Sequence, residues 1–135
     1  IYSYGAGHAE TGVFCIYTAL NKETEAKALA TIRRVIDDFL AKGPTTEELE
    51  RAREQSKANV IMGLESTQSR MSHAGRSLLF SGEILTPEQI LDAYDRVTRE
   101  DVVALAQEIF AWDRASLSAV GQVRTAEEYR RLVLG

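Results

Sequence analysis

The sequence predicts an α+β protein, in which an antiparallel sheet carries a block of helices packed on it. Two segments rich in aromatic and β-branched residues open the chain within residues 1–20 and read as strands. From residue 22 onward the pattern is helical, and four threonine-led helix starts divide it. Because the helices follow the strands as a block, the order excludes a doubly wound parallel fold. A chain of 135 residues has the size of one domain, so we expect a single α+β domain over residues 1–135.

The two strands differ in how clearly they are bounded. The first is expected to end near Tyr4, because Gly5-Ala6-Gly7 loosens the pattern after it. The second is expected over residues 11–20, and its alternating positions are apolar on both faces. A strand of this kind is usually covered on both faces. Because Ile1 already lies inside a strand-like pattern, without Met, signal peptide or polar tail, we expect the chain to be a piece of a larger protein.

A first helix is predicted from Lys22 to about Lys42. Asn21 is the expected N-cap, and acidic residues follow in the first turn, where the helix dipole favours them. Gly43 followed by proline is a typical C-terminal stop.

A longer helical pattern runs from about residue 46 to residue 81. Thr45-Thr46-Glu47-Glu48 forms a capping box at its start, and Gly82 ends it. Gly63 and the polar stretch 66–69 are weak helix formers, so we expect a bend or break there.

Three further helices are predicted from capping boxes at Thr86–Gln89, Thr98–Asp101 and Thr125–Glu128. The first of them has proline at its first helical position and ends near Arg96. The small residues of Ser116–Gly121 predict a third strand between the last two helices.

Composition narrows the functional classes. The net charge of −4 argues against a nucleic-acid or anionic-membrane binder, and no apolar stretch is long enough to cross a bilayer. We therefore expect a cytoplasmic or otherwise soluble protein. Its single cysteine excludes an intrachain disulfide. Two histidines and one cysteine cannot fill a His/Cys zinc site, so no metal ligand or cofactor is expected in this chain.

The histidines, the cysteine and the carboxylate pairs of the sequence do not form a recognisable catalytic motif. His8 fits neither H-E-x-x-H nor H-x-x-E-H, and we interpret it as an exposed turn residue. Cys15 lies between apolar neighbours and is interpreted as a buried structural residue. The carboxylate pairs Asp37-Asp38 and Glu47-Glu48 are interpreted as solvated charges or caps, and Trp112 as a packing residue.

The most unusual segment is residues 64–76. Small polar residues interrupt a helical pattern there, which allows another element to approach closely. Arg70 either pairs with a carboxylate such as Glu65 or faces a binding cleft. His73 is either structural or orients a partner across such a cleft.

Five segments, in order, resemble motifs of the pitrilysin/insulinase family of zinc metallopeptidases, and most of all its bacterial processing-peptidase branch. Each motif is weak alone, but the series spans about Tyr2 to Gly121. The segments are Tyr2-Ser3-Tyr4 with Glu10–Tyr17, Thr46–Gln55, Leu64–Met71 with Gly75-Arg76, Val97–Val102 and Leu117–Gly121.

The resemblance implies which part of such an enzyme this chain represents. Family members have two homologous α+β halves, one of which carries the zinc motif H-x-x-E-H, and this sequence lacks that motif. The chain therefore resembles the later part of the C-terminal, non-zinc half. The substrate-binding tyrosine of that half would precede Ile1, so no catalytic role is carried onto this chain. Arg70, His73 and Tyr4 are the candidates for lining the substrate cleft.

The function that the resemblance implies is the C-terminal, substrate-enclosing half of a zinc-dependent metalloendopeptidase. Zinc would lie in the other half or in a partner subunit, a polypeptide substrate would be held as an added strand, and this chain alone would be inactive. Two alternatives stay open: a non-catalytic partner subunit of a processing peptidase, and an unrelated α+β protein-interaction module. We also expect the isolated chain to self-associate through its sheet, since an unprotected apolar edge pairs readily.

Overall fold

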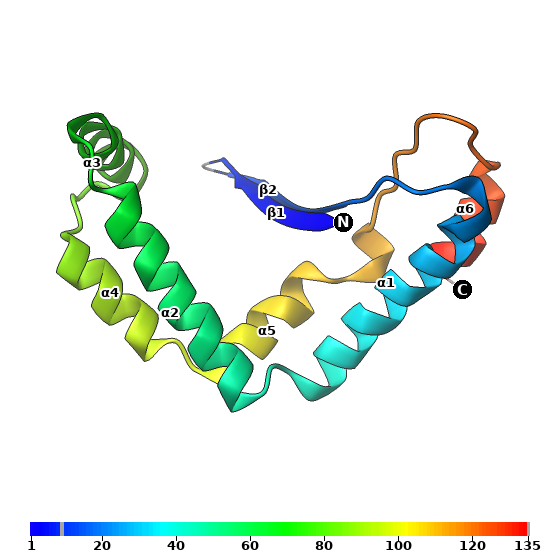
Figure 1. The fold of residues 1–135 in the computed structure, drawn as a ribbon, viewed down its shortest axis with the longest axis horizontal. Coiled ribbons are helices and arrows are strands. Elements are labelled where there is room, and N and C mark those ends of the chain that lie inside the picture. The colour runs from blue at the N-terminus through cyan, green and yellow to red at the C-terminus, as the bar shows by residue number, and fades with distance from the viewer. Residues whose placement is uncertain (9, 135) are drawn as a thin grey trace. The chain divides into compact units, whose positions relative to one another are not determined.

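The structure is a computed structural model that describes residues 1–8 and 10–134, and it is α+β, as the sequence predicts (Figure 1). The chain divides into two compact units, which are described separately: Ile1–Gly43 with Val103–Gly135, and Pro44–Val102. In chain order the elements are β1 (Tyr2–Gly7), β2 (Gly12–Tyr17), α1 (Lys22–Lys42), α2 (Thr46–Gly63), α3 (Thr67–Ser81), α4 (Pro87–Arg96), α5 (Arg99–Ile109), a 3-10 turn (Trp112–Arg114) and α6 (Ala126–Leu134).

The hairpin of β1 and β2 is antiparallel, with Tyr2 opposite Tyr17 and Gly7 opposite Gly12. The first strand does not end near Tyr4, as predicted, but continues to Gly7. Cross-strand pairing holds the glycines extended, because the ladder uses backbone groups that glycine also has. A Cβ on Gly12 would lie 3.2 Å from the carbonyl oxygen of Ala6, so a glycine suits this close approach.

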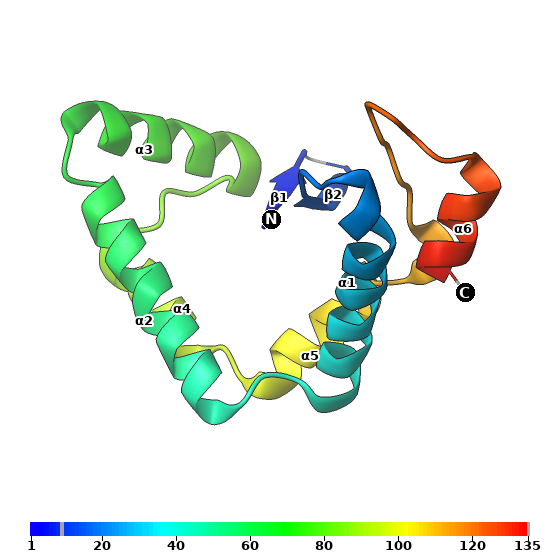
Figure 2. The ribbon, with the colours of Figure 1, turned by 45° about the vertical axis from the view of Figure 1, so that its right-hand side comes forward.

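In the first unit, α1 has the predicted bounds, and α6 packs beside it (Figures 1 and 2). Ile36 lies in the small core between elements and is only 8% exposed. Asn21 is at the N-cap position, but its side chain makes no capping bond; the hydroxyl of Thr24 donates to its carbonyl instead. Gly43 ends the helix with φ 64°, a backbone conformation that favours glycine.

In the second unit, α2 and α4 lie side by side. The predicted capping box of Thr45 and Glu48 opens α2, and that of Thr86 and Gln89 opens α4. The predicted break also occurs: α2 ends at Gly63, and α3 begins after Ser66, whose hydroxyl accepts a bond from the amide of Ser69. Gly82 ends α3 in the left-handed conformation.

Residues 116–121 form no strand, so that prediction is wrong. Two strands are assigned among the described residues, and they pair with each other. The segment has the composition of a strand, but a strand persists only when a neighbour satisfies its backbone groups. Val120 is fully exposed as a result. Among the described residues, no helix is both long and apolar enough to span a membrane.

Candidate functional site

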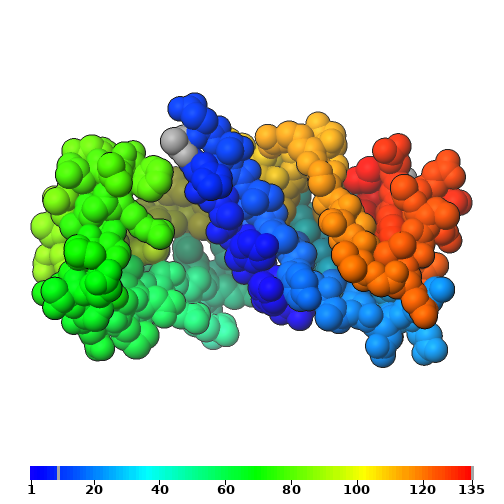
Figure 3. Space-filling model, turned by 90° about the horizontal axis from the view of Figure 1, so that it is seen from above, coloured from blue at the N-terminus to red at the C-terminus, as the bar shows by residue number. Residues whose placement is uncertain are grey.

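The exposed face of the hairpin carries three tyrosines. Successive side chains alternate between the faces of a sheet, so Tyr2, Tyr4 and Tyr17 share one face. The ring centroid of Tyr2 lies 5.0 Å from that of Tyr17 and 6.0 Å from that of Tyr4. All three rings are exposed, Tyr2 by 58%. We call this surface, together with Ala6, Val13 and Cys15, the tyrosine face; the hairpin that carries it is coloured blue in Figure 3.

Tyr4 and Cys15 are directly opposite each other in the ladder. Hydrogen bonding to the Cys15 side chain, and then the electrostatic interaction with it, raises the pKa of Tyr4 above its ordinary value. The Tyr4 hydroxyl lies on an exposed sheet face, where it can donate a hydrogen bond. Cys15 is half-buried rather than fully buried as the sequence predicts, because the tyrosine face has no cover over it within the described residues.

The opposite face of the hairpin is partly covered. Phe14 meets Phe110, which follows α5, in an edge-to-face contact with ring centroids 5.0 Å apart. Ile16, on the same face, is half-buried. The sequence predicts covers on both faces of the second strand, and the structure of this chain supplies one of them.

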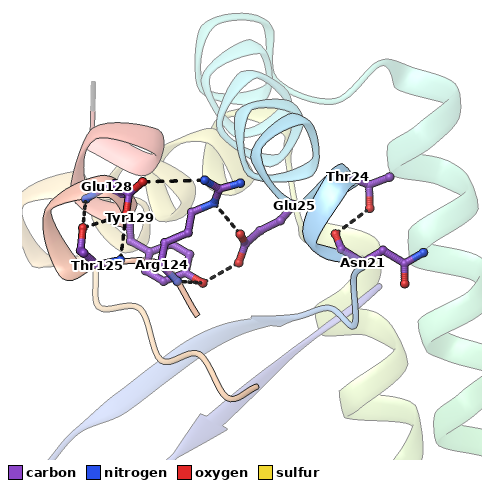
Figure 4. Close-up of polar contacts among 7 residues, drawn as sticks. All are labelled: Asn21, Thr24, Glu25, Arg124, Thr125, Glu128 and Tyr129. Atoms are coloured by element: carbon purple, nitrogen blue, oxygen red, sulfur yellow. Dashed lines mark hydrogen bonds and ion pairs between the residues drawn. The ribbon is translucent and has the colours of Figure 1, made fainter. Parts of the chain in front are cut away.

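Two polar clusters hold the remainder of the first unit. In the cluster of Figure 4, the carboxylate of Glu25 on α1 accepts from the hydroxyl of Tyr129 at 2.5 Å and from Nε of Arg124 at 2.7 Å. The hydrogen bond from Tyr129, followed by the interactions with Arg124, holds the pKa of Glu25 below its ordinary value. This cluster ties α6 to the start of α1. The sequence analysis could not predict this cluster from a motif, because Glu25 is about a hundred residues away from Arg124 and Tyr129 in the chain.

The second cluster is centred on Asp37, which the sequence analysis treats as a solvated charge or cap. Its carboxylate accepts from Nε of Arg33 at 2.7 Å and from the indole nitrogen of Trp112 at 2.9 Å. The Arg33 guanidinium also lies over the Trp112 ring, 4.3 Å from its centroid. The hydrogen bonds from Arg33 and Trp112 lower the pKa of Asp37. The cluster holds the 3-10 turn against α1, so these side chains have a structural role.

Arg70 and His73, the other two cleft candidates, both lie on α3 in the second unit. Nε of Arg70 donates to the carbonyl oxygen of Leu64 at 2.7 Å, so the hydrogen bond goes to the end of α2 and not to Glu65. Nε2 of His73 lies 3.5 Å from the carbonyl oxygen of Leu85. Arg70 is exposed and His73 is half-buried. Tyr4 belongs to the other unit, and the structure brings only Arg70 and His73 onto one element.

The side chains that the structure describes include no group suited to zinc. Over residues 1–8 and 10–134, no three His, Cys, Asp or Glu side chains come together in a way that could hold a metal ion. Tetrahedral zinc sites need three or four such ligands. A tetrahedral zinc ion therefore has no fit among the described residues.

Comparison with known proteins agrees with the motifs. Residues 1–56 match the family described as the Peptidase M16 inactive domain. The chain is 31% identical to the uncharacterized zinc protease YmxG of Bacillus subtilis over 115 residues, 85% of this chain and 28% of that protein. It is also 31% identical, over 96% of its length, to the uncharacterized zinc protease SCO5738 of Streptomyces coelicolor, again 28% of that protein.

A mitochondrial relative gives a similar match. The mitochondrial-processing peptidase subunit beta of Lentinula edodes is 30% identical over 133 residues, 96% of this chain and 28% of that protein. The chain thus spans a little over a quarter of the length of these relatives. The ordered motifs, the inactive-domain match and the similarity along nearly the whole chain lead to one assignment. The chain is similar to the M16, or pitrilysin/insulinase, peptidases, and its matches agree with the later part of their C-terminal, non-zinc half.

Proposed function

We propose that these 135 residues are part of a longer polypeptide, a zinc-dependent metalloendopeptidase, and form part of the wall that encloses its peptide substrate. The observation that carries the proposal is the match to an inactive domain in a chain whose relatives are named zinc proteases and processing peptidases. Zinc would be supplied by another part of that polypeptide or by a partner subunit, where it activates the attacking water.

The hairpin is the proposed substrate-binding element. Its two strands pair only with each other among the described residues, so each has an edge at which an extended peptide can add as a further strand. Peptide binding at such an edge relies on backbone hydrogen bonds and tolerates many sequences. The exposed hydroxyl of Tyr4 on β1 would donate to a peptide carbonyl beside that edge.

Arg70 and His73 are proposed for a separate part of the substrate path. Arg70 is exposed, and its positive charge is available to a peptide carboxylate while Nε stays on the carbonyl of Leu64. His73 would line the substrate path beside the loop at Leu85, whose carbonyl oxygen its ring nitrogen approaches, and would not serve as a metal ligand.

Peptide binding to the isolated chain tests this proposal. Titration with an extended, uncharged fluorescent peptide should shift the amide NMR signals of β1 and β2 selectively. Tyr4→Phe should weaken binding by a few-fold, the loss of one hydrogen bond. Tyr17→Phe, on the same face, is the matched control and should bind normally. Shifts spread evenly over the chain, or equal effects of the two variants, would contradict the proposal.

The names of several relatives leave one alternative open, in which the chain acts within an assembly of subunits. Several relatives are named as subunit beta of a mitochondrial-processing peptidase, and are therefore parts of assemblies. The chain would then belong to a non-catalytic companion that binds substrate for a separate zinc-bearing subunit. The presence or absence of H-x-x-E-H in the complete polypeptide separates the two functions.

A further inference from the structure

Helix α3 turns its apolar side to solvent. Helix positions i, i+4, i+7 and i+8 share one side, and in α3 they are Met71, Gly75, Leu78 and Leu79, which we call the α3 stripe. The three large side chains are exposed, Leu79 by 83%. A Cβ placed on Gly75 would meet no atom within 4 Å, so the middle of the stripe is also open.

The polar side of α3 faces its own unit. The hydroxyl of Ser77 donates to the carbonyl of Glu83 at 2.7 Å, and Nε2 of His73 lies near the carbonyl of Leu85. Both side chains are half-buried and lie opposite the stripe on the helix. In Figure 2, α3 extends away from the end of α2, and it has no extended packing with α2 or α4.

In the usual amphipathic helix the apolar stripe is buried and the polar side is exposed to solvent, whereas the apolar stripe of α3 is exposed. Contiguous apolar residues on the surface of a soluble protein mark a site of interaction. The α3 stripe therefore requires a partner surface, and the charges around it indicate which kind.

Residues 66–82 contain Arg70, His73 and Arg76 but no Asp or Glu, whereas acidic residues outnumber basic ones in the rest of the second unit. Arg76 is exposed and lies next to the stripe, one helical step from Gly75. Two copies packed through α3 would bring their Arg76 side chains together with no carboxylate on either helix to offset them. A helix carrying carboxylates beside its apolar face would instead be attracted.

We propose that the α3 stripe is the docking site for an acidic amphipathic helix of a partner protein. Its apolar face would cover Met71, Leu78 and Leu79, and its carboxylates would lie at Arg76, so that two helices pair face to face. The open position at Gly75 would let the two backbones approach closely. The proposal uses only contacts within the second unit and is independent of the proposed peptidase role.

Fluorescence anisotropy with two short labelled helical peptides tests the proposal. Both peptides carry Leu along one face; one has Glu at the flanking positions and the other has Lys. The complete 135-residue chain should bind the Glu peptide and reject the Lys peptide. Leu79→Ser should weaken binding of the Glu peptide by about tenfold, because it removes the most exposed apolar side chain of the stripe. Arg76→Glu should weaken the Glu peptide similarly and strengthen the Lys peptide.

Two control variants make the test specific. Phe80→Ser changes an exposed apolar residue of α3 that lies off the stripe, and Arg51→Glu reverses an exposed charge on α2. Both should bind the Glu peptide as the unmodified chain does. Absence of binding, equal binding of the two peptides, or equal losses in Leu79→Ser and Phe80→Ser would overturn the proposal. A dimer of the chain that Leu79→Ser dissociates would replace it by self-association.

Discussion

The contact between Phe14 and Phe110 should determine how firmly the hairpin is held in the first unit. Leucine at either position removes the edge-to-face ring contact and part of the apolar area. Because such volume-reducing swaps are mild, each single variant should lower the free energy of hairpin opening by about 1 kcal/mol. Aromatic pairs contribute roughly 0.5–1.5 kcal/mol beyond area burial. Since Phe14 is 40% exposed, a coupling of about 0.5–1 kcal/mol is expected.

Amide hydrogen exchange of the cross-strand amides measures this opening directly, without assuming that both units unfold together. The double variant Phe14→Leu/Phe110→Leu should lose less than the sum of the two singles by the coupling energy. Tyr2→Leu with Phe110→Leu is the matched control, because Tyr2 lies on the opposite face and its effect should add. Additivity within about 0.3 kcal/mol for the phenylalanine pair would refute the reasoning.

Three further predictions concern the caps, the ion cluster and the open sheet face. Thr45→Ala should destabilise the second unit by about 1 kcal/mol in urea unfolding, because it removes the α2 cap, while Thr46→Ala should not. Glu25 has a folded-state pKa below its ordinary value of 4.5, so its contribution is present above that pH and is lost as the pH falls through the lower folded value. In Glu25→Gln, the free energy of unfolding should therefore fall less steeply as the pH is lowered below 4.5. An unchanged pH dependence of stability would count against the cluster. The isolated chain should self-associate in light scattering, and Tyr2→Lys should shift it toward the 15.0 kDa monomer; a monomeric unmodified chain at high concentration would contradict this.

Helix starts and stops could be read from the sequence because their chemistry is local. The side chain of Thr45 bonds the amide three residues ahead, and the carboxylate of Glu48 returns the bond, so four residues contain the whole signal. The same holds for Thr86, Thr98 and Thr125. Gly82 marks a stop because it alone tolerates the left-handed backbone at that position.

The errors arose where long-range pairing decides the outcome. The first strand extends to Gly7 because its partner strand holds the glycines in place, which composition does not reveal. Residues 116–121 have strand composition but no neighbouring strand among the described residues. Arg70 is a different case: its bond to Leu64 is local, but the acceptor is a backbone carbonyl, which no residue pattern specifies. The Glu25 cluster joins side chains from opposite ends of the chain. The cleft candidates Tyr4, Arg70 and His73 remain proposals.

Following one peptide for both binding and cleavage tests our proposal that this chain is a substrate-binding wall without its own zinc chemistry. The purified chain is dialysed, analysed for metal, and incubated with an extended quenched fluorescent peptide, with and without added zinc. We expect no stoichiometric zinc, measurable peptide binding, and an intact peptide by mass spectrometry, because no metal-bound water would be available for hydrolysis. Cleavage by the pure chain that a chelator abolishes, or one tightly held zinc ion per chain, would contradict it.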